Sequence, residues 1–179
     1  FAAATEVRGS PVPFTSAKGG GYRPGPHVTP EGKWIMHRMR DEVHYGDRIV
    51  RCYADRPPHV DAMLRAAVAA RPNTVALVEG SRRVTFAELN AAADRIAGNL
   101  AKRQVVAGDR IALIVGNRIE FAEAVLAAAR LGAVVVPINI RQRKPENEYV
   151  LANSGAKVLI HEADLAAPMP DEMAVAALR

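Results

Sequence analysis

Three short apolar runs alternate with two stretches of helical periodicity between residues 110 and 160. The runs are Ile111–Val115, Ala133–Ile138 and Lys157–Ile160, and in none of them do apolar and polar residues alternate. Unbroken apolar runs of this length are typical of strands that are covered on both faces of a sheet. Strands that alternate with helices require crossover connections. This region therefore predicts an α/β fold with a mostly parallel sheet and right-handed crossovers.

The two stretches between these runs carry signals for the start and the end of a helix. Asn117 is placed to cap the first helix, whose apolar residues keep the helical period through Ala129. Gly132 is placed to end that helix. Pro145 suits the first turn of the second helix, and Gly155 is placed to end it.

Upstream of this region the pattern predicts a strand, a helix, a hairpin and a second helix. They are expected at Arg48–Tyr53, at Val60–Ala70, at Val75–Val78 with Arg83–Phe86, and from Thr85 to Lys102. Thr85 and Glu88 match a capping box for the second helix. The first helix is expected to turn inward the side chains of Val60, Met63, Leu64, Ala67 and Val68.

Residues 1–47 predict an irregular, basic tail, because Gly19-Gly20-Gly21 and five prolines interrupt them and no apolar period is visible. Residues 48–179 then form the α/β domain, and a last helix is expected at Met173–Leu178. Through Arg40 there are six Lys or Arg against two Asp or Glu, so +4 of the net charge of +5 lies in the tail. A nucleic-acid-binding domain would carry this excess on a folded face, and we therefore predict no nucleic-acid partner.

Composition places the chain among ordinary globular proteins, at 49% hydrophobic and 24% charged residues. No window of about 18 consecutive apolar residues is present, so no membrane span is predicted. The start lacks the pattern of a secretory signal. Cys52 is the only cysteine, which excludes an internal disulfide and fits a reducing compartment. A cytoplasmic location is therefore expected.

Four blocks of sequence carry a family resemblance. They are VALVEG from Val75, RRVTFAELN from Arg82, GDRIALIVGNRIEFAEAVLAAARLGAVVVPINIR from Gly108, and PENEYVLANSGAKVLI from Pro145. In order, spacing and residue identity they resemble the N-terminal segment of the AMP-forming adenylating enzymes. This superfamily comprises acyl-CoA synthetases, luciferases and peptide-synthetase adenylation domains. The resemblance runs from Val60 to about Leu165 and is nearer to fatty-acyl and aryl-acyl CoA ligases than to peptide-synthetase domains.

The resemblance implies an acid–CoA ligase that uses ATP and Mg²⁺ to activate a fatty or aromatic carboxylic acid as an acyl-adenylate. The acyl group then passes to coenzyme A. The family's Ser/Thr/Gly-rich phosphate loop, acidic metal ligand, ribose-binding Asp and C-terminal lysine have no counterpart in these 179 residues. We therefore expect the front part of a larger enzyme, a truncated N-terminal α/β subdomain with a Rossmann-like sheet, which is inactive alone.

One loop is the candidate site. By the same resemblance, Asn139-Ile140-Arg141 corresponds to an Asn-x-Arg sequence in which Arg141 contacts a phosphate of coenzyme A and Asn139 positions the loop. The position of these residues supports that role, because the loop follows the carboxyl end of a predicted parallel strand, where open α/β sheets bind ligands. A guanidinium also suits phosphate oxygens. The alternative for Arg141 is a solvated loop cation.

The remaining candidates have simpler interpretations. Gly116-Asn117 also follows a strand and could hold an anion, although a helix cap is favoured. No histidine lies at metal-ligand spacing from another His, from Cys or from a carboxylate, so no metal site is predicted. We expect Cys52 to be a small buried hydrophobe, Asp41-Glu42 to be a solvated pair and His161 to be exposed.

Two other functions remain open at this stage. One is a non-catalytic α/β binding or interaction module. The other is an independent Rossmann-like nucleotide binder, although no G-x-G-x-x-G sequence follows any of the predicted strands. A front part of a larger protein is also expected to expose apolar surface and to self-associate.

Overall fold

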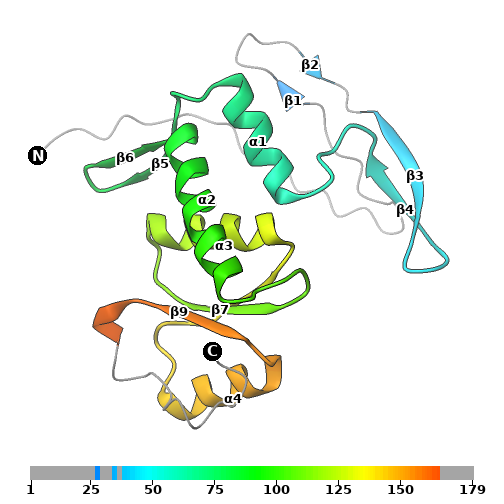
Figure 1. Ribbon diagram of the computed structural model, residues 1–179. Coiled ribbons are helices and arrows are strands. Elements are labelled where there is room, and N and C mark those ends of the chain that lie inside the picture. The colour runs from blue at the N-terminus through cyan, green and yellow to red at the C-terminus, as the bar shows by residue number, and fades with distance from the viewer. Residues whose placement is uncertain (1–26, 29–33, 36–37, 166–179) are drawn as a thin grey trace, which may run out of the picture. The chain divides into compact units, whose positions relative to one another are not determined.

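The chain folds as two compact units that divide after Arg56 (Figure 1). The structure, a computed structural model, describes residues 27–28, 34–35 and 38–165. The helix expected at Met173–Leu178 lies outside the described residues. The division after Arg56 differs from the expected boundary at residue 47.

The described residues of the first unit, 27–28, 34–35 and 38–56, contain two antiparallel strand pairs. The strands are β1 (His27–Val28), β2 (Trp34–Ile35), β3 (Met39–His44) and β4 (Arg48–Tyr53), and β1 pairs with β2 and β3 with β4. Strand β4 has the predicted bounds, whereas β3 lies in the segment that was expected to be irregular. Its sequence MRDEVH is mostly polar, so no apolar pattern marks it as a strand. Pairing with β4 forms it, across a turn in which Tyr45 and Gly46 take positive φ angles of 55° and 92°.

The second unit contains four α-helices and five strands among its described residues. In chain order they are α1 (Val60–Ala70), β5 (Val75–Glu79), β6 (Arg82–Thr85), α2 (Phe86–Lys102), β7 (Arg110–Ile114), α3 (Ile119–Leu131), β8 (Val134–Pro137), α4 (Lys144–Ser154) and β9 (Val158–His161), followed by a 3-10 turn at Ala163–Leu165. Strands β5 and β6 pair as the predicted hairpin. None of these helices has the length and apolar character to cross a membrane.

A three-stranded parallel sheet of order β8-β7-β9 is the centre of this unit, as the apolar runs predicted. Helices α2 and α3 lie on one face of it and α4 on the other (Figure 1). Strand β7 is buried on both faces, because its alternate residues contact different cores. Ile111 and Leu113 pack with α2 and α3, whereas Ala112 and Ile114 pack with Leu151 of α4.

Several helices begin or end where capping and glycine residues in the sequence predicted. Thr85 and Glu88 form the capping box of α2, in which the Glu88 N–H donates to Thr85 Oγ1 at 3.3 Å and the Thr85 N–H to Glu88 Oε2 at 2.8 Å. Gly132 and Gly155 end α3 and α4 with φ angles of 69° and 62°, in the left-handed region that glycine adopts without a steric penalty. Pro145 lies in the first turn of α4.

The prediction that Asn117 caps α3 is wrong. The helix begins at Ile119 after Arg118, and no side chain of the cap residue accepts a hydrogen bond. Instead the Ile119 N–H donates to Glu79 Oε2 at 3.2 Å, so a carboxylate from the end of β5 takes the place of the local cap. A contact across 40 residues leaves no signal in the local sequence.

The inward face of α1 also differs from the prediction. Val60 and Met63 are 50% and 56% exposed, whereas Leu64 is buried and Asp61 is only 4% exposed. Asp61 can lie inside because its carboxylate is fully engaged by two arginines. Arg65 Nε donates to it at 2.6 Å and Arg130 Nε at 2.8 Å. The buried pair of Asp61 with Arg130 thus takes an inward position on α1 that the apolar pattern assigned to Val60 and Met63.

Candidate functional site

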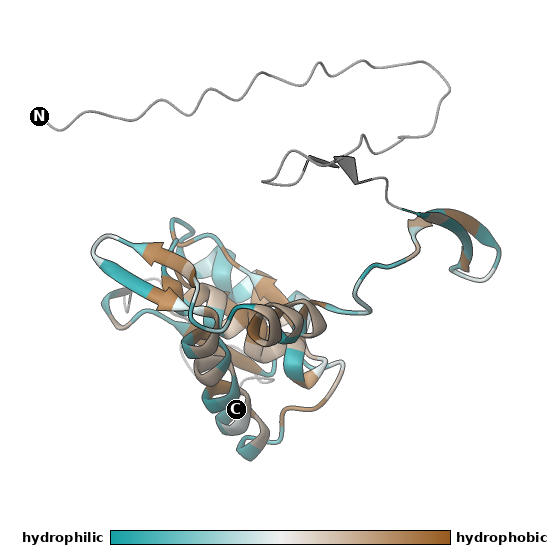
Figure 2. Ribbon diagram, turned by 90° about the horizontal axis from the view of Figure 1, so that it is seen from above, coloured by the Kyte–Doolittle hydropathy of each residue, from teal (hydrophilic) through white to brown (hydrophobic). Residues whose placement is uncertain are grey.

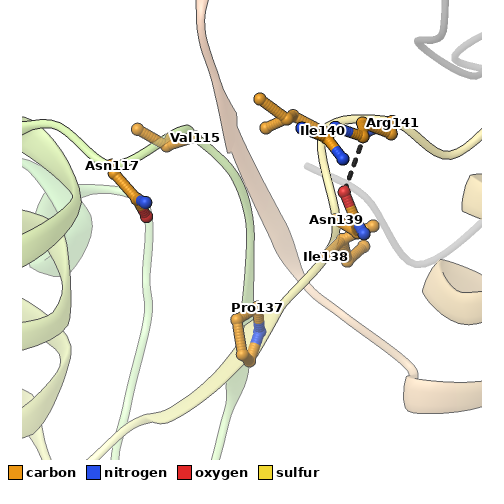
Figure 3. A pocket seen from close by; sticks show the side chains of 7 residues that line it. All are labelled: Val115, Asn117, Pro137, Ile138, Asn139, Ile140 and Arg141. Carbon is orange, nitrogen blue, oxygen red and sulfur yellow. Dashed lines mark hydrogen bonds between the residues drawn. The ribbon is translucent and has the colours of Figure 1, made fainter.

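A pocket of about 360 Å³ opens at the carboxyl ends of β7 and β8 (Figure 3). It is lined by Val115 and Asn117 after β7 and by Pro137, Ile138, Asn139, Ile140 and Arg141 at the end of β8 and after it. Parallel strands bring their carboxyl ends to one edge of the sheet, and ligands of open α/β sheets bind at that edge. The predicted site residues Asn139 and Arg141 therefore line one pocket with Asn117.

The loop after β8 is held by its own asparagine. Asn139 Oδ1 accepts a hydrogen bond from the Arg141 N–H at 3.0 Å, the dashed line of Figure 3. The backbone carbonyl of Asn139 accepts a second one from the Gln142 N–H at 3.0 Å. Asn and Asp side chains stabilise turns in this way. Arg141 is exposed, and its guanidinium has no hydrogen-bond or ion-pair partner among the residues that the structure describes. A free cation thus stands at the wall of the pocket.

Glu162, directly after β9, contacts the residues that follow β7 at the same edge of the sheet. The Gly116 N–H donates to Glu162 Oε1 at 2.5 Å, and Arg118 Nη1 donates to Oε2 at 3.3 Å. The Gly116 N–H is therefore already occupied by a carboxylate of the chain itself. This contact disfavours the alternative that Gly116-Asn117 holds an external anion. Sequence reasoning missed Glu162, although an acidic residue directly after the third strand was the available signal.

Charges around the start of α3 are paired with one another. Arg82 Nη1 donates to Glu120 Oε1 at 2.8 Å and to Glu79 Oε2 at 3.1 Å, and Arg118 lies 3.4 Å from Glu120. The hydrogen bond from Arg82 holds the pKa of Glu120 below its ordinary value. A second hollow of about 390 Å³ lies here, between the β5–β6 hairpin and α3. Because its charged side chains neutralise one another, it offers less to an anionic ligand than the pocket beside Arg141.

In the first unit, strand pairing brings together residues that the sequence analysis had set aside. Glu42, His44 and Cys52 offer donor atoms that all lie within 4.8 Å of one another. Cys52 is half-buried rather than buried, and His161, in the second unit, is exposed as expected. No sequence spacing revealed the cluster, because Cys52 joins it across the hairpin.

Glu42 is not the solvated residue that was expected. Arg56 donates to both of its carboxylate oxygens, at 3.0 and 2.6 Å, and Arg40 and His44 also contact it. The hydrogen bonds from Arg56 and then Arg40 lower the pKa of Glu42 to about 2. Its side chain is therefore an ordered anion in the middle of the hairpin.

The parallel sheet and the helices on both of its faces define an α/β domain of the Rossmann-like type, with a pocket at the carboxyl ends of the strands. A family model described as "AMP-binding enzyme" matches residues 64–178. The chain belongs to this family, and it corresponds to the N-terminal portion of its acyl-CoA ligases.

Known relatives give the extent of the match. The chain is 43% identical over 111 residues to the long-chain-fatty-acid–CoA ligase FadD13 of Mycobacterium tuberculosis, and this match covers 61% of the chain and 22% of the ligase. It is 40% identical over 90 residues to a feruloyl-CoA synthase of an Amycolatopsis species, covering 50% of the chain and 18% of that enzyme.

A solved structure confirms the fold. The N-terminal domain of FACL13 from Mycobacterium tuberculosis superimposes with a TM-score of 0.59 at 41% identity, and the match covers 62% of the chain and 29% of that structure. The chain thus spans about a fifth of the length of the curated relatives it matches.

Proposed function

We propose that the protein to which this portion belongs is an AMP-forming acid–CoA ligase. It activates a carboxylic acid with ATP and Mg²⁺ as an acyl-adenylate, and it transfers the acyl group to coenzyme A. The observation that carries the proposal is the 43% identity to FadD13 over 111 residues. One relative is named for long-chain fatty acids and another for ferulate, so the acid is fatty or aromatic.

Arg141 binds a phosphate of coenzyme A in this proposal, and Asn139 shapes the loop that presents it. Three observations support these roles. The loop follows the carboxyl end of a parallel strand, the Asn139 side chain accepts a hydrogen bond from the backbone of Arg141, and the guanidinium is exposed beside the pocket. A planar guanidinium binds two phosphate oxygens at once, which a lysine does not.

The chain by itself is proposed to be inactive. Transfer of AMP to a carboxylate develops negative charge on phosphate oxygens, and catalysis requires cations and N–H donors placed around them. The family motifs that supply these groups have no counterpart in the 179 residues. The proposed location of the enzyme is the cytosol, which the single cysteine of these 179 residues supports.

The test measures pyrophosphate release and acyl-CoA formation by the whole protein with ATP, Mg²⁺, coenzyme A and single acids. Saturated fatty acids of increasing length and ferulate form the panel. We expect release that depends on the acid, and none from residues 1–179 alone. If no acid supports release by the whole protein, the alternative of a non-catalytic binding module becomes the better account.

Replacing Arg141 tests its role separately. In the whole enzyme, Arg141→Gln is expected to raise the KM for coenzyme A by about tenfold, the effect of losing one charge-assisted contact of about 1.4 kcal/mol. Acid-dependent pyrophosphate release in the absence of coenzyme A should not change. Arg143→Gln is the matched control, because it removes the same charge two residues away. Equal effects of both substitutions would reduce Arg141 to a solvated loop cation.

A further inference from the structure

Three side chains of the β3–β4 hairpin converge on one face. Glu42 and His44 are two residues apart on β3, and residues at this spacing share a face of a strand. Cys52 is directly opposite Arg40, which belongs to the same face. The donor atoms of Glu42, His44 and Cys52 all lie within 4.8 Å of one another.

The contacts meet at a single nitrogen. Cys52 Sγ lies 3.8 Å from His44 Nε2, and Glu42 Oε2 lies 3.0 Å from the same atom. In a nucleophile–histidine–acid triad the nucleophile and the acid contact opposite nitrogens of the ring, so that the acid orients the base. Here both contact Nε2, and the histidine cannot pass a proton from one to the other in that way. Three donor atoms within 4.8 Å of one another are instead close enough to share one metal ion.

We propose that Glu42, His44 and Cys52 bind a zinc ion. Zinc takes thiolate, imidazole and carboxylate ligands at about 2.3, 2.0–2.1 and 2.0–2.2 Å, in tetrahedral geometry. Bonds of those lengths at a tetrahedral angle place sulfur about 3.6 Å from nitrogen, and nitrogen about 3.4 Å from oxygen. The observed distances are 3.8 Å from Cys52 Sγ to His44 Nε2 and 3.0 Å from Glu42 Oε2 to His44 Nε2. Small side-chain rotations would bring both to the values for zinc. A water molecule would complete the four ligands.

Two arginines hold the carboxylate ligand in place. Arg40 Nε and Arg56 Nη1 both donate to Glu42 Oε1, which leaves Oε2 toward His44. Carboxylates that bind metals are commonly oriented by such second hydrogen bonds. Arg56 Nη2 also donates to Oε2 at 2.6 Å, and zinc must displace this bond. The affinity is consequently lower than that of a site with four protein ligands.

The hairpin has ion pairs but no buried core among residues 38–56. Of residues 38–56 none is fully buried, and the cross-strand pair Val43 and Ile49, on the opposite face, is 68% and 74% exposed. A two-stranded hairpin without a core is marginally stable in water. An ion that joins β3 to β4 would add its binding free energy to the folding free energy of this unit.

The experiment titrates the 179-residue chain with Co²⁺ at pH 7 under a phosphine reductant, and then displaces Co²⁺ with Zn²⁺. We expect one equivalent to bind, with a thiolate-to-cobalt charge-transfer absorption. Cys52→Ser should abolish this absorption, and His44→Ala and Glu42→Gln should each weaken binding by at least tenfold. His161→Gln is the control outside the cluster, and His27→Gln/His37→Gln removes the two tail histidines. Both control proteins should bind like the parent chain.

Three results would overturn the proposal. They are an absence of binding by the parent chain, a charge-transfer absorption that persists in Cys52→Ser, and an affinity that neither His44→Ala nor Glu42→Gln reduces. Unfolding of a variant is recognised separately, because the helices lie in the second unit and their circular dichroism should remain. A loss of binding with the helical signal intact therefore reports on the ligands.

Discussion

Arg130 joins three helices through one guanidinium. From α3 it donates to Asp61 of α1 at 2.8 Å and to Asn90 Oδ1 of α2 at 2.8 Å, and it also pairs with Asp94. The side chains of Arg130 and Asp61 are only 8% and 6% exposed. Burial raises the pKa of Asp61, but hydrogen bonds from Arg65 and Arg130 outweigh it and hold the pKa below its ordinary value. Asp61 is therefore a buried anion that depends on its partners.

Arg130→Met should lower the free energy of unfolding by about 3–5 kcal/mol, because it leaves Asp61 buried without its inner partner. Arg65→Met is the matched control. It removes the other arginine from the same carboxylate, but that side chain is 61% exposed. We expect a loss of about 0–1 kcal/mol for a pair of this kind. Urea denaturation followed by circular dichroism measures both, and equal losses would show that burial does not decide the cost.

At the scale of single elements, α3 depends on a side chain from elsewhere. Glu79→Ala should lower the free energy of unfolding by about 1 kcal/mol, since the Ile119 N–H then loses its acceptor and the helix its N-terminal charge. Asn117→Ala should have almost no effect, because the exposed Asn117 does not cap the helix. Thermal unfolding of both variants distinguishes the two caps. A larger loss for Asn117→Ala would restore the interpretation drawn from the sequence.

Elements whose signals are local could be predicted from the sequence, and elements held by distant contacts could not. The apolar runs predicted β7, β8 and β9, and the glycines predicted the ends of α3 and α4. Each of these signals lies within the element itself or directly beside it. Strand β3 is polar and exists through its pairing with β4. The same distinction applies to the candidate site. The loop with Arg141 follows a recognisable strand, whereas Glu162 reaches Gly116 across 46 residues.

At the scale of the whole molecule, apolar surface is expected to cause self-association. Val43, Tyr45 and Ile49 are 68%, 88% and 74% exposed. Val43 pairs with Ile49 beside the turn that contains Tyr45, and Figure 2 shows apolar bands on the strands of this hairpin. Contiguous apolar residues on a strand pair are common contacts between molecules. Val43→Thr/Ile49→Thr should therefore reduce both the binding of a hydrophobic dye and the sedimentation coefficient at high concentration.

Val106→Thr is the control for this change, because Val106 is 60% exposed but lies outside the hairpin. It should leave dye binding and sedimentation as they are in the parent chain. Unaltered self-association in the hairpin variant would place the contact surface elsewhere. The substitutions keep β-branched residues, so they preserve the strand propensity of the hairpin.

The alternation along β7 has a consequence for which parts of the unit can move independently. Since Ile111 and Leu113 serve one core and Ala112 and Ile114 another, the sheet works as a partition between two packed compartments. The loop that carries Arg141 leads from β8 into α4, on the compartment without α2 and α3. Local opening involves the side with fewer buried contacts first. In the proposed role of Arg141, the loop therefore adapts to a phosphate of coenzyme A while the compartment with α2 and α3 stays packed.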